Sequence, residues 1–274
     1  MSFWQEKIEN LTGKIYKSYP LAGGDINEVE YLKSERGEFV LKKNKHMPKD
    51  FFPCEAKNLL FLKERKLPVP EVVGYGEGYL LLRYYPPGEK NYGLAGEMLA
   101  LLHQNSSQKC GLDFDNYIGS LPQKNTYESS WPLFYRNHRI LPMLEMIGVM
   151  RKEHNDFSLW ARLLDKLEII IGEDYTISAL HGDLWGGNLY HSQEGPLFID
   201  PACYYGDHLV DIAMTELFGG FSRDFYASYS TIMSLGERYR SLAKLYQLYP
   251  LLVHAKLFGS SYYQQAREIA KRYV

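Results

Sequence analysis

The first part of the chain alternates between apolar and polar residues in short runs, which is the pattern of half-buried β-strands. Residues 28–32 and 39–42 follow this pattern on either side of a polar turn at 34–37. Residues 51–66 then change to the spacing of a helix, which ends before two prolines because proline cannot continue a helix. We therefore predict a β-rich segment, with a short helix at 2–11, strands between 15 and 45, a helix at 51–66, and strands at 72–76 and 79–84.

The pattern becomes helical after Pro86-Pro87-Gly88, a tripeptide that interrupts regular structure. We place a lobe boundary just before it, between residues 1–84 and residues 85–274. The fold class that this order predicts is α+β, with a small β-rich N-terminal lobe and a larger, mainly helical C-terminal lobe. In the second lobe we predict helices at 94–103, 131–150, 157–171 and over most of 211–273, and short strands around a hairpin turn at 192–195.

Composition and charge exclude several classes of protein. The 274 residues are 45% hydrophobic and 23% charged, with a net charge of -2, so neither nucleic acid nor an anionic membrane is an expected partner. Three scattered cysteines without a CxxC pair predict neither a disulfide framework nor a zinc site. The chain also has no signal-peptide pattern and no apolar run of about 20 residues, so we expect a cytoplasmic protein. No oligomeric state is predicted.

Candidate chemistry concentrates in the loop at residues 180–188. An Asp in a glycine-rich turn is common, but His181, Asp183 and Asn188 reproduce the H-x-D-x-x-x-x-N spacing of kinase catalytic loops. A carboxylate in that place accepts a hydrogen bond from the attacking hydroxyl and takes its proton. Asp183 is therefore the predicted catalytic base, and His181 is expected to order the loop. His254 lies on a predicted helix and is expected to be structural.

A second carboxylate follows the loop. Asp200 ends the apolar run at 197–199, which is expected to project its side chain into a cleft. Mg²⁺ prefers oxygen ligands and retains several waters, so one amide, one carboxylate and phosphate oxygens suit it. Asn188 and Asp200 are therefore the predicted magnesium ligands.

Two charged residues of the first lobe complete a phosphate-binding set. Lys42 ends the strand at 39–41, where a kinase lysine reaches the α- and β-phosphates of ATP, and Lys43 should point to the opposite face. Glu55, thirteen residues further on, is the predicted helix partner of Lys42, with Glu64 on the same helix as the alternative.

The small lobe also offers a glycine-rich turn between two predicted strands, which contains Gly24 and Asn27. Its backbone N–H groups are placed to cover nucleotide phosphates, although a plain β-turn fits the same residues equally well. A β-rich lobe followed by a helical lobe that carries the polar motifs is the plan of a protein-kinase-like fold. We accordingly expect the first lobe to bind ATP, with the nucleotide near Arg83 and Tyr85, and the second lobe to bind the acceptor.

The chain resembles the fructosamine kinase (ketosamine-3-kinase) family, a branch of the aminoglycoside-phosphotransferase-like kinases. The resemblance spans roughly residues 23–262. It rests on HGDLWGGN at 181–188 and DPACYYGD at 200–207, with further matches at 116–123, 211–221 and 245–259. It implies ATP-dependent phosphorylation of the sugar 3-hydroxyl of ketoamines, which are adducts of sugars with amines, either free or on protein lysines. Because the 3-phosphate is labile, this reaction frees the amine and repairs glycation.

Residue by residue, the resemblance implies the roles already assigned to Lys42, Glu55, Asp183, Asn188 and Asp200. Trp185 lies in the loop, and one expectation is that it stacks on the sugar or on the substrate amine through a cation–π contact. A buried core tryptophan is the alternative.

Two positions depart from the family pattern. Leu209 stands where the family usually has Glu, and Arg83 stands where an acidic residue is common. The effects of these departures on substrate preference and on the details of nucleotide binding stay open. The alternative within the class is another small-molecule kinase, acting on an aminoglycoside, choline or a related amine. A pseudokinase is a poor fit because Lys42, Asp183, Asn188 and Asp200 are all present.

Overall fold

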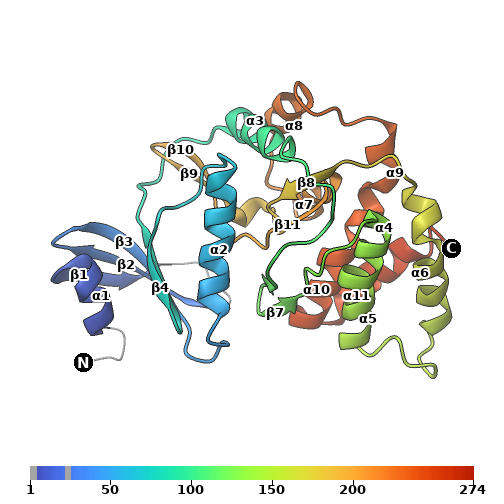
Figure 1. Ribbon diagram of the computed structural model, residues 1–274, viewed down its shortest axis with the longest axis horizontal. Coiled ribbons are helices and arrows are strands. Elements are labelled where there is room, and N and C mark those ends of the chain that lie inside the picture. The colour runs from blue at the N-terminus through green and yellow to red at the C-terminus, as the bar shows by residue number, and fades with distance from the viewer. Residues whose placement is uncertain (1–4, 22–25) are drawn as a thin grey trace. The chain divides into compact units, whose positions relative to one another are not determined.

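The computed structural model describes residues 5–21 and 26–274, so the predicted turn residue Gly24 lies outside the described part. By contacts within the chain, it divides into two compact units (Figure 1). The first unit contains the residues up to Asn91 together with Leu189–Pro201. The second contains Tyr92–Asn188 and Ala202–Val274. The first unit therefore extends past residue 84 and also takes a later segment that ends just after Asp200.

A five-stranded antiparallel sheet in the order β1-β2-β3-β5-β4 forms the frame of the first unit. The alternating runs of the sequence become its strands, because alternation places every second side chain on one face. Register pairs Lys42 of β3 with Val29 of β2 and with Leu80 of β5. The bounds are β1 (Ile15–Pro20), β2 (Glu28–Ser34), β3 (Gly37–Lys43), β4 (Val72–Gly76) and β5 (Tyr79–Arg83).

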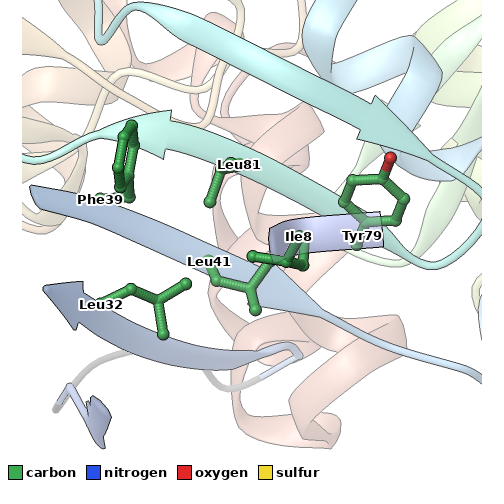
Figure 2. Close-up of a cluster of buried hydrophobic side chains, with 6 residues drawn as sticks. All are labelled: Ile8, Leu32, Phe39, Leu41, Tyr79 and Leu81. Carbon is green, nitrogen blue, oxygen red and sulfur yellow. The ribbon is translucent and has the colours of Figure 1, made fainter. Parts of the chain in front are cut away.

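One face of this sheet carries a small hydrophobic core, shown in Figure 2. Ile8 of helix α1 (Gln5–Thr12) packs among side chains of β2, β3 and β5. The sheet residues in this cluster are Leu32, Phe39, Leu41, Tyr79 and Leu81.

Helix α2 (Phe51–Glu64) contacts strands β4 and β5. Because side chains alternate along β3, Lys42 points away from the face that Phe39 and Leu41 share, and it meets Glu55 of α2. Lys43 points the other way and pairs with Glu30 of β2 at 2.7 Å. The predicted opposite orientation of the two lysines is confirmed.

A β-hairpin belongs to the first unit although it lies far along the chain. Strands β9 (Leu189–Ser192) and β10 (Gly195–Phe198) pair around the predicted turn at 192–195. Hydrogen bonds hold the segment after β5 to this hairpin, and they include Gly88 N–H to the His191 carbonyl at 2.9 Å and the Tyr190 hydroxyl to the Tyr85 carbonyl at 2.8 Å. The hairpin thus fixes the strand that leads into Asp200.

The second unit is mainly helical and surrounds two short strand pairs, β6 (Asn116–Ile118) with β7 (Leu121–Gln123) and β8 (Ile177–Leu180) with β11 (Tyr204–Asp207). The predicted helix at 131–150 is three consecutive segments, namely α4 (Trp131–Phe134), a π-helical turn (Tyr135–Ile140) and α5 (Leu141–Met146). The other helices are α3 (Tyr92–His103), α6 (Phe157–Ile171), α7 (Leu209–Leu217), α8 (Arg223–Ser230), α9 (Glu237–Tyr246), α10 (Leu248–Phe258) and α11 (Ser260–Ala270).

Buried aromatic side chains form much of the core of the second unit. Trp131, Tyr135 and Tyr246 pack with ring centroids 5.4–6.0 Å apart, and the Trp131 indole N–H donates to the Tyr246 hydroxyl at 2.9 Å. The predicted α+β class, with an N-terminal antiparallel sheet and a mainly helical C-terminal part, is confirmed. Across the described residues, none of the helices combines the length and apolar character of a membrane span.

Candidate active site

Lys42 of the first unit lies between two carboxylates. Its ammonium contacts Glu55 of α2 at 2.6 Å and also forms an ion pair with Asp200. Burial alone would lower the pKa of Lys42, but the charges of Asp200 and Glu55 outweigh that effect and raise it above its usual value. Lys42 therefore carries a fixed positive charge, and the predicted Lys42–Glu55 pair is confirmed as a contact.

Asp200 is held in an unusual backbone conformation, with φ of 55°. Such a positive φ is uncommon for a residue other than glycine and asparagine, and it is retained where surrounding contacts determine it. The next residue is anchored, since the Asn58 side chain of α2 donates to the Pro201 carbonyl at 2.8 Å. The Asp200 side chain is still 45% exposed, so its carboxylate can meet a ligand as well as Lys42.

In the second unit, Asp183 and Asn188 form one hydrogen-bonded loop. The Asn188 side-chain N–H₂ donates to the Asp183 carbonyl at 2.8 Å and approaches its carboxylate at 3.3 Å. A short 3₁₀ turn (Gly186–Asn188) brings the two residues together across their five-residue separation. Because the nitrogen end of the amide is used, its oxygen is the end that can serve as a ligand.

Asp211, near the start of α7, binds the backbone of this loop. Its two carboxylate oxygens accept the backbone N–H groups of His181 at 2.7 Å and Gly182 at 2.9 Å. The Asp183 N–H in turn approaches the His181 ring nitrogen Nδ1 at 3.3 Å. Gly182 has φ of 83° and sits so close to the Ala202 carbonyl that a Cβ would clash with it. The loop is therefore fixed by backbone contacts on both sides of Gly182.

A buried network that the sequence did not predict holds Asp211. His103 of α3 contacts the Asp211 carboxylate with Nε2 at 3.2 Å and the Tyr229 hydroxyl with Nδ1 at 2.7 Å. Burial tends to raise the pKa of Asp211, yet the hydrogen bonds and charge of His103, together with the Gly182 N–H, keep it below its usual value. No local spacing connects residues 103, 211 and 229, so only the fold reveals this group.

A second unpredicted network surrounds the segment that follows Asp200. Asn116 donates to the Cys203 carbonyl at 2.8 Å, and Gln123 donates to the Ala202 carbonyl at 3.1 Å. Arg139 is fully buried and donates to the Asn125 side chain at 2.7 Å, with its guanidinium 3.9 Å from the Tyr204 ring centroid. The β6–β7 hairpin thus fixes residues 202 and 203.

The predicted nucleotide-binding residues have structural partners of their own. Asn27 accepts a hydrogen bond from the Asn44 side chain at 3.3 Å. Arg83 is exposed, pairs with Glu194 at 3.0 Å and lies over the Tyr85 ring at 4.9 Å. None of these contacts tests a role in ATP binding, which stays a prediction.

Trp185 and Leu209 differ sharply in exposure. Trp185 is 41% exposed, which excludes the buried core tryptophan considered from the sequence, whereas Leu209 is 3% exposed. Leu209 therefore contributes to the core at the start of α7.

The structure brings the predicted residues together in two groups. Lys42, Glu55 and Asp200 meet in the first unit, and Asp183 and Asn188 meet in the second. That Asp200 joins Asp183 and Asn188 around one metal-bound triphosphate stays a prediction.

Comparisons with known proteins identify the family. The fructosamine kinase family model matches residues 2–274. A protein of Enterococcus faecium named "probable ketoamine kinase" is 34% identical over 275 residues, covering 96% of each chain.

Solved structures show the same relationship. A protein of Thermobifida fusca, provisionally named fructosamine-3-kinase, has a TM-score of 0.86 at 29% identity, covering 97% of this chain and 96% of its own. The choline kinase LicA of Streptococcus pneumoniae shares the fold, with a TM-score of 0.65 at 17% identity, covering 98% and 97%. This chain belongs to the fructosamine kinase family and is an ATP-dependent phosphotransferase with a protein-kinase-like fold.

Proposed function

We propose that this kinase transfers the γ-phosphoryl group of ATP to the 3-hydroxyl of a ketoamine, either free or on a glycated protein. The observation that carries the proposal is the HGDLWGGN loop, in which Asp183 is hydrogen-bonded to Asn188 and flanked by an exposed Trp185. The family match over residues 2–274 supports the same acceptor class.

Asp183 acts on the acceptor in this proposal. Its carboxylate accepts a hydrogen bond from the 3-hydroxyl, whose oxygen attacks the γ-phosphorus. A new P–O bond forms to the sugar, the bond to the β–γ bridging oxygen breaks, ADP leaves, and the hydroxyl proton passes to Asp183. The backbone contacts to Asp211 and His181 hold this carboxylate in place, which is what phosphoryl transfer requires of the protein.

Lys42 acts on ATP. A fixed cation between Glu55 and Asp200 has the charge and the restricted position to contact the α- and β-phosphates. Glu55 keeps the ammonium in place and compensates part of its charge, and Asp200 pairs with the same ammonium. In this proposal the phosphate oxygens bind Lys42 beside these two carboxylates.

Magnesium is the metal that the family implies, and the residues present fit it. Asn188 offers an amide oxygen and Asp200 an exposed carboxylate, which are ligands that Mg²⁺ accepts. When bound, the ion supplies positive charge against the phosphates.

Trp185 is the proposed platform for the acceptor sugar. A ring that is 41% exposed in the same loop as Asp183 offers a flat apolar face beside the proposed base. Aromatic faces suit the C–H side of a sugar ring and attract a neighbouring ammonium.

An acceptor panel tests the proposal. Purified protein is given ATP, Mg²⁺ and, in turn, fructosyl-lysine, ribulosyl-lysine, a glycated peptide, choline and an aminoglycoside, and ADP formation is measured. We expect turnover with one or more ketoamines and none with choline or the aminoglycoside. Turnover of choline or the aminoglycoside with inert ketoamines would contradict the proposed acceptor and favour a related small-molecule kinase.

A further inference from the structure

The chain around Asp200 is attached to the first unit by a hydrogen bond on each side of that residue. Before it, the N–H of Phe198, the last residue of β10, donates to the Pro68 carbonyl at 2.9 Å. After it, the Asn58 side chain of α2 donates to the Pro201 carbonyl at 2.8 Å. Two residues, at positions 199 and 200, therefore lie between the attached ones.

This short span accounts for the backbone conformation of Asp200. A φ of 55° is sparsely populated by residues with a side chain, and a chain free to relax would return to negative φ. Attachment at residues 198 and 201 restricts the dihedral angles of the two residues between them. The positive φ of Asp200 is therefore retained by the bonds on either side of it.

The chain after Pro201 is also held by side-chain amides. Gln123 donates to the Ala202 carbonyl at 3.1 Å and Asn116 donates to the Cys203 carbonyl at 2.8 Å. Three successive carbonyls, at positions 201 to 203, thus each accept an N–H from an asparagine or glutamine. If the bond from Asn58 were lost, rearrangement would therefore concentrate in residues 199–201.

Asn58 is deeply buried, although an apolar residue would serve packing better. Its side chain is 2% exposed, and α2 buries mainly apolar residues around it, among them Phe52, Leu59 and Leu62. A buried amide is unfavourable unless hydrogen bonds replace its contacts with water. The bond to the Pro201 carbonyl supplies such a replacement, and it also specifies the direction of the backbone at that point.

The direction of the backbone decides where the Asp200 carboxylate points. In the present conformation it pairs with Lys42 and remains 45% exposed. A change of φ at Asp200 to a negative value would turn the side chain relative to β10 and take the carboxylate away from this position. Groups that orient a metal-binding carboxylate from behind typically contribute 10–100-fold to metal affinity.

We propose that Asn58 is a positioning residue for Asp200. By holding the Pro201 carbonyl, it sets the carboxylate in the direction from which it binds the magnesium of Mg-ATP. The inference rests on the proposed function, because it uses the role assigned there to Asp200. Asn58 acts through the backbone and not through a contact with the metal.

Nucleotide binding measured with and without metal tests this role independently of turnover. AMP-PNP is titrated calorimetrically against the full-length protein, once in EDTA and once in Mg²⁺. The ratio of the two Kd values is the magnesium enhancement. The variants are Asn58→Leu, which keeps most of the volume, and Asn58→Ser, which leaves room for a water molecule. Asp200→Ala is the reference for loss of the proposed ligand.

Ser34→Ala is the matched control. Ser34 is also buried in the first unit, and its hydroxyl donates to the backbone carbonyl of Thr12 at 2.9 Å. Its loss therefore removes a buried hydrogen bond to a carbonyl without touching the segment at residues 198–201. Melting temperatures of all variants verify folding, and titrations are made well below the lowest of them.

We expect both Asn58 variants to reduce the magnesium enhancement about tenfold and to leave the affinity in EDTA unchanged. The Mg²⁺ concentration for half-maximal turnover should rise about tenfold, and saturating Mg²⁺ should restore kcat. The Ser34→Ala control should keep the enhancement of the wild type. A merely structural role of Asn58 would lower the melting temperature and leave the enhancement as it is.

Hydrogen exchange of the wild type supplies a test that needs no variant. If the chain itself holds this segment, the backbone N–H groups of residues 198–205 should exchange at rates within about fivefold of each other with and without Mg-AMP-PNP. A larger gain in protection on binding would show that the nucleotide orders the segment, and it would overturn the inference.

The outcomes separate this inference from the proposed function. An unchanged magnesium enhancement in the folded Asn58 variants would overturn the positioning role even if ketoamines are phosphorylated. An unchanged enhancement in Asp200→Ala would contradict the metal role assigned in the proposed function, and the inference with it. Inert ketoamines together with a reduced enhancement in the Asn58 variants would contradict the proposed acceptor and leave the role of Asn58 standing.

Discussion

The buried carboxylate of Asp211 accepts the backbone N–H of His181 at 2.7 Å, two residues before the proposed base Asp183. This contact links α7 to the loop without using any side chain of the loop itself. Because Asp211 is also held by His103, the position of Asp183 depends on residues from α3, α7 and α8. The geometry of the loop that contains Asp183 therefore depends on contacts among several helices of the second unit.

Asp211→Asn should reduce both stability and turnover. An amide has one oxygen where the carboxylate has two, so the N–H of His181 or Gly182 loses its acceptor in a buried place, at a cost of about 1–3 kcal/mol. We expect a lower melting temperature and a kcat reduced about tenfold, with the KM for ATP little changed. Asp224→Asn, an exposed aspartate on α8, is the control. An unchanged kcat would show that the loop keeps its geometry without this anchor.

Asp183→Ala and Asp200→Ala should have different effects. Loss of Asp183 removes the group that orients the hydroxyl, so kcat should fall on the order of 10²-fold or more with ATP affinity largely intact. Loss of Asp200 should weaken engagement of Mg-ATP, seen as a higher KM for ATP. Steady-state kinetics and nucleotide titration separate the two, with Asp174→Ala as the control at an exposed aspartate. Equal, mild effects from both changes would contradict the assigned roles.

Lys42→Met should destabilise the first unit as well as impair ATP use. The Lys42–Glu55 pair is almost buried, and removing one partner of a buried pair costs about 3–5 kcal/mol because the other charge is left alone. The double variant Lys42→Met/Glu55→Gln should recover part of the free energy of unfolding while the KM for ATP stays high. If the double variant regained normal ATP affinity, Lys42 would have a structural role alone.

His208 should make the protein less stable in mild acid. Burial lowers the pKa of His208 to about 4, against the opposing charge of Asp207. The pKa of His208 in the folded protein lies below its unfolded value of about 6.5. The free energy of unfolding is therefore unaffected by this group above about pH 6.5, and it falls as the pH drops toward 4. The loss should reach about 3 kcal/mol near pH 4. Urea unfolding from pH 7 to 4 measures it, and His208→Gln should flatten the profile; an equally steep profile would assign the loss to other groups.

The parts that the sequence predicted well depend on local patterns. Alternation in residues 28–43 and helical spacing after Phe51 identify the strands β2 and β3 and helix α2. Lys42 lies at the end of β3 and Glu55 near the start of α2, which is the next element along the chain. The contact between them could therefore be predicted although thirteen positions separate them. The loop residues Asp183 and Asn188 are likewise close along the chain, so their spacing alone indicates their contact.

The parts that the sequence did not predict depend on contacts between distant segments. Strands β8 and β11 are four-residue, largely buried segments, and such short runs give no clear period. The π-helical turn at Tyr135–Ile140 interrupts a stretch whose hydrophobic spacing is that of one helix. His103 and Asp211 meet across 108 positions, and Lys42 meets Asp200 across 158, so only tertiary packing connects them.

The most direct measurement is the position of the phosphate on the product and its dependence on Asp183. Fructosyl-lysine labelled with ¹³C in the sugar is incubated with ATP and Mg²⁺, and the product is followed by ¹³C and ³¹P NMR with wild type and Asp183→Ala. The account predicts phosphorus coupling centred on C3 with the wild type, followed by release of lysine, and no such product with the variant on the same timescale. A phosphate on another carbon, or comparable product from Asp183→Ala, would contradict it.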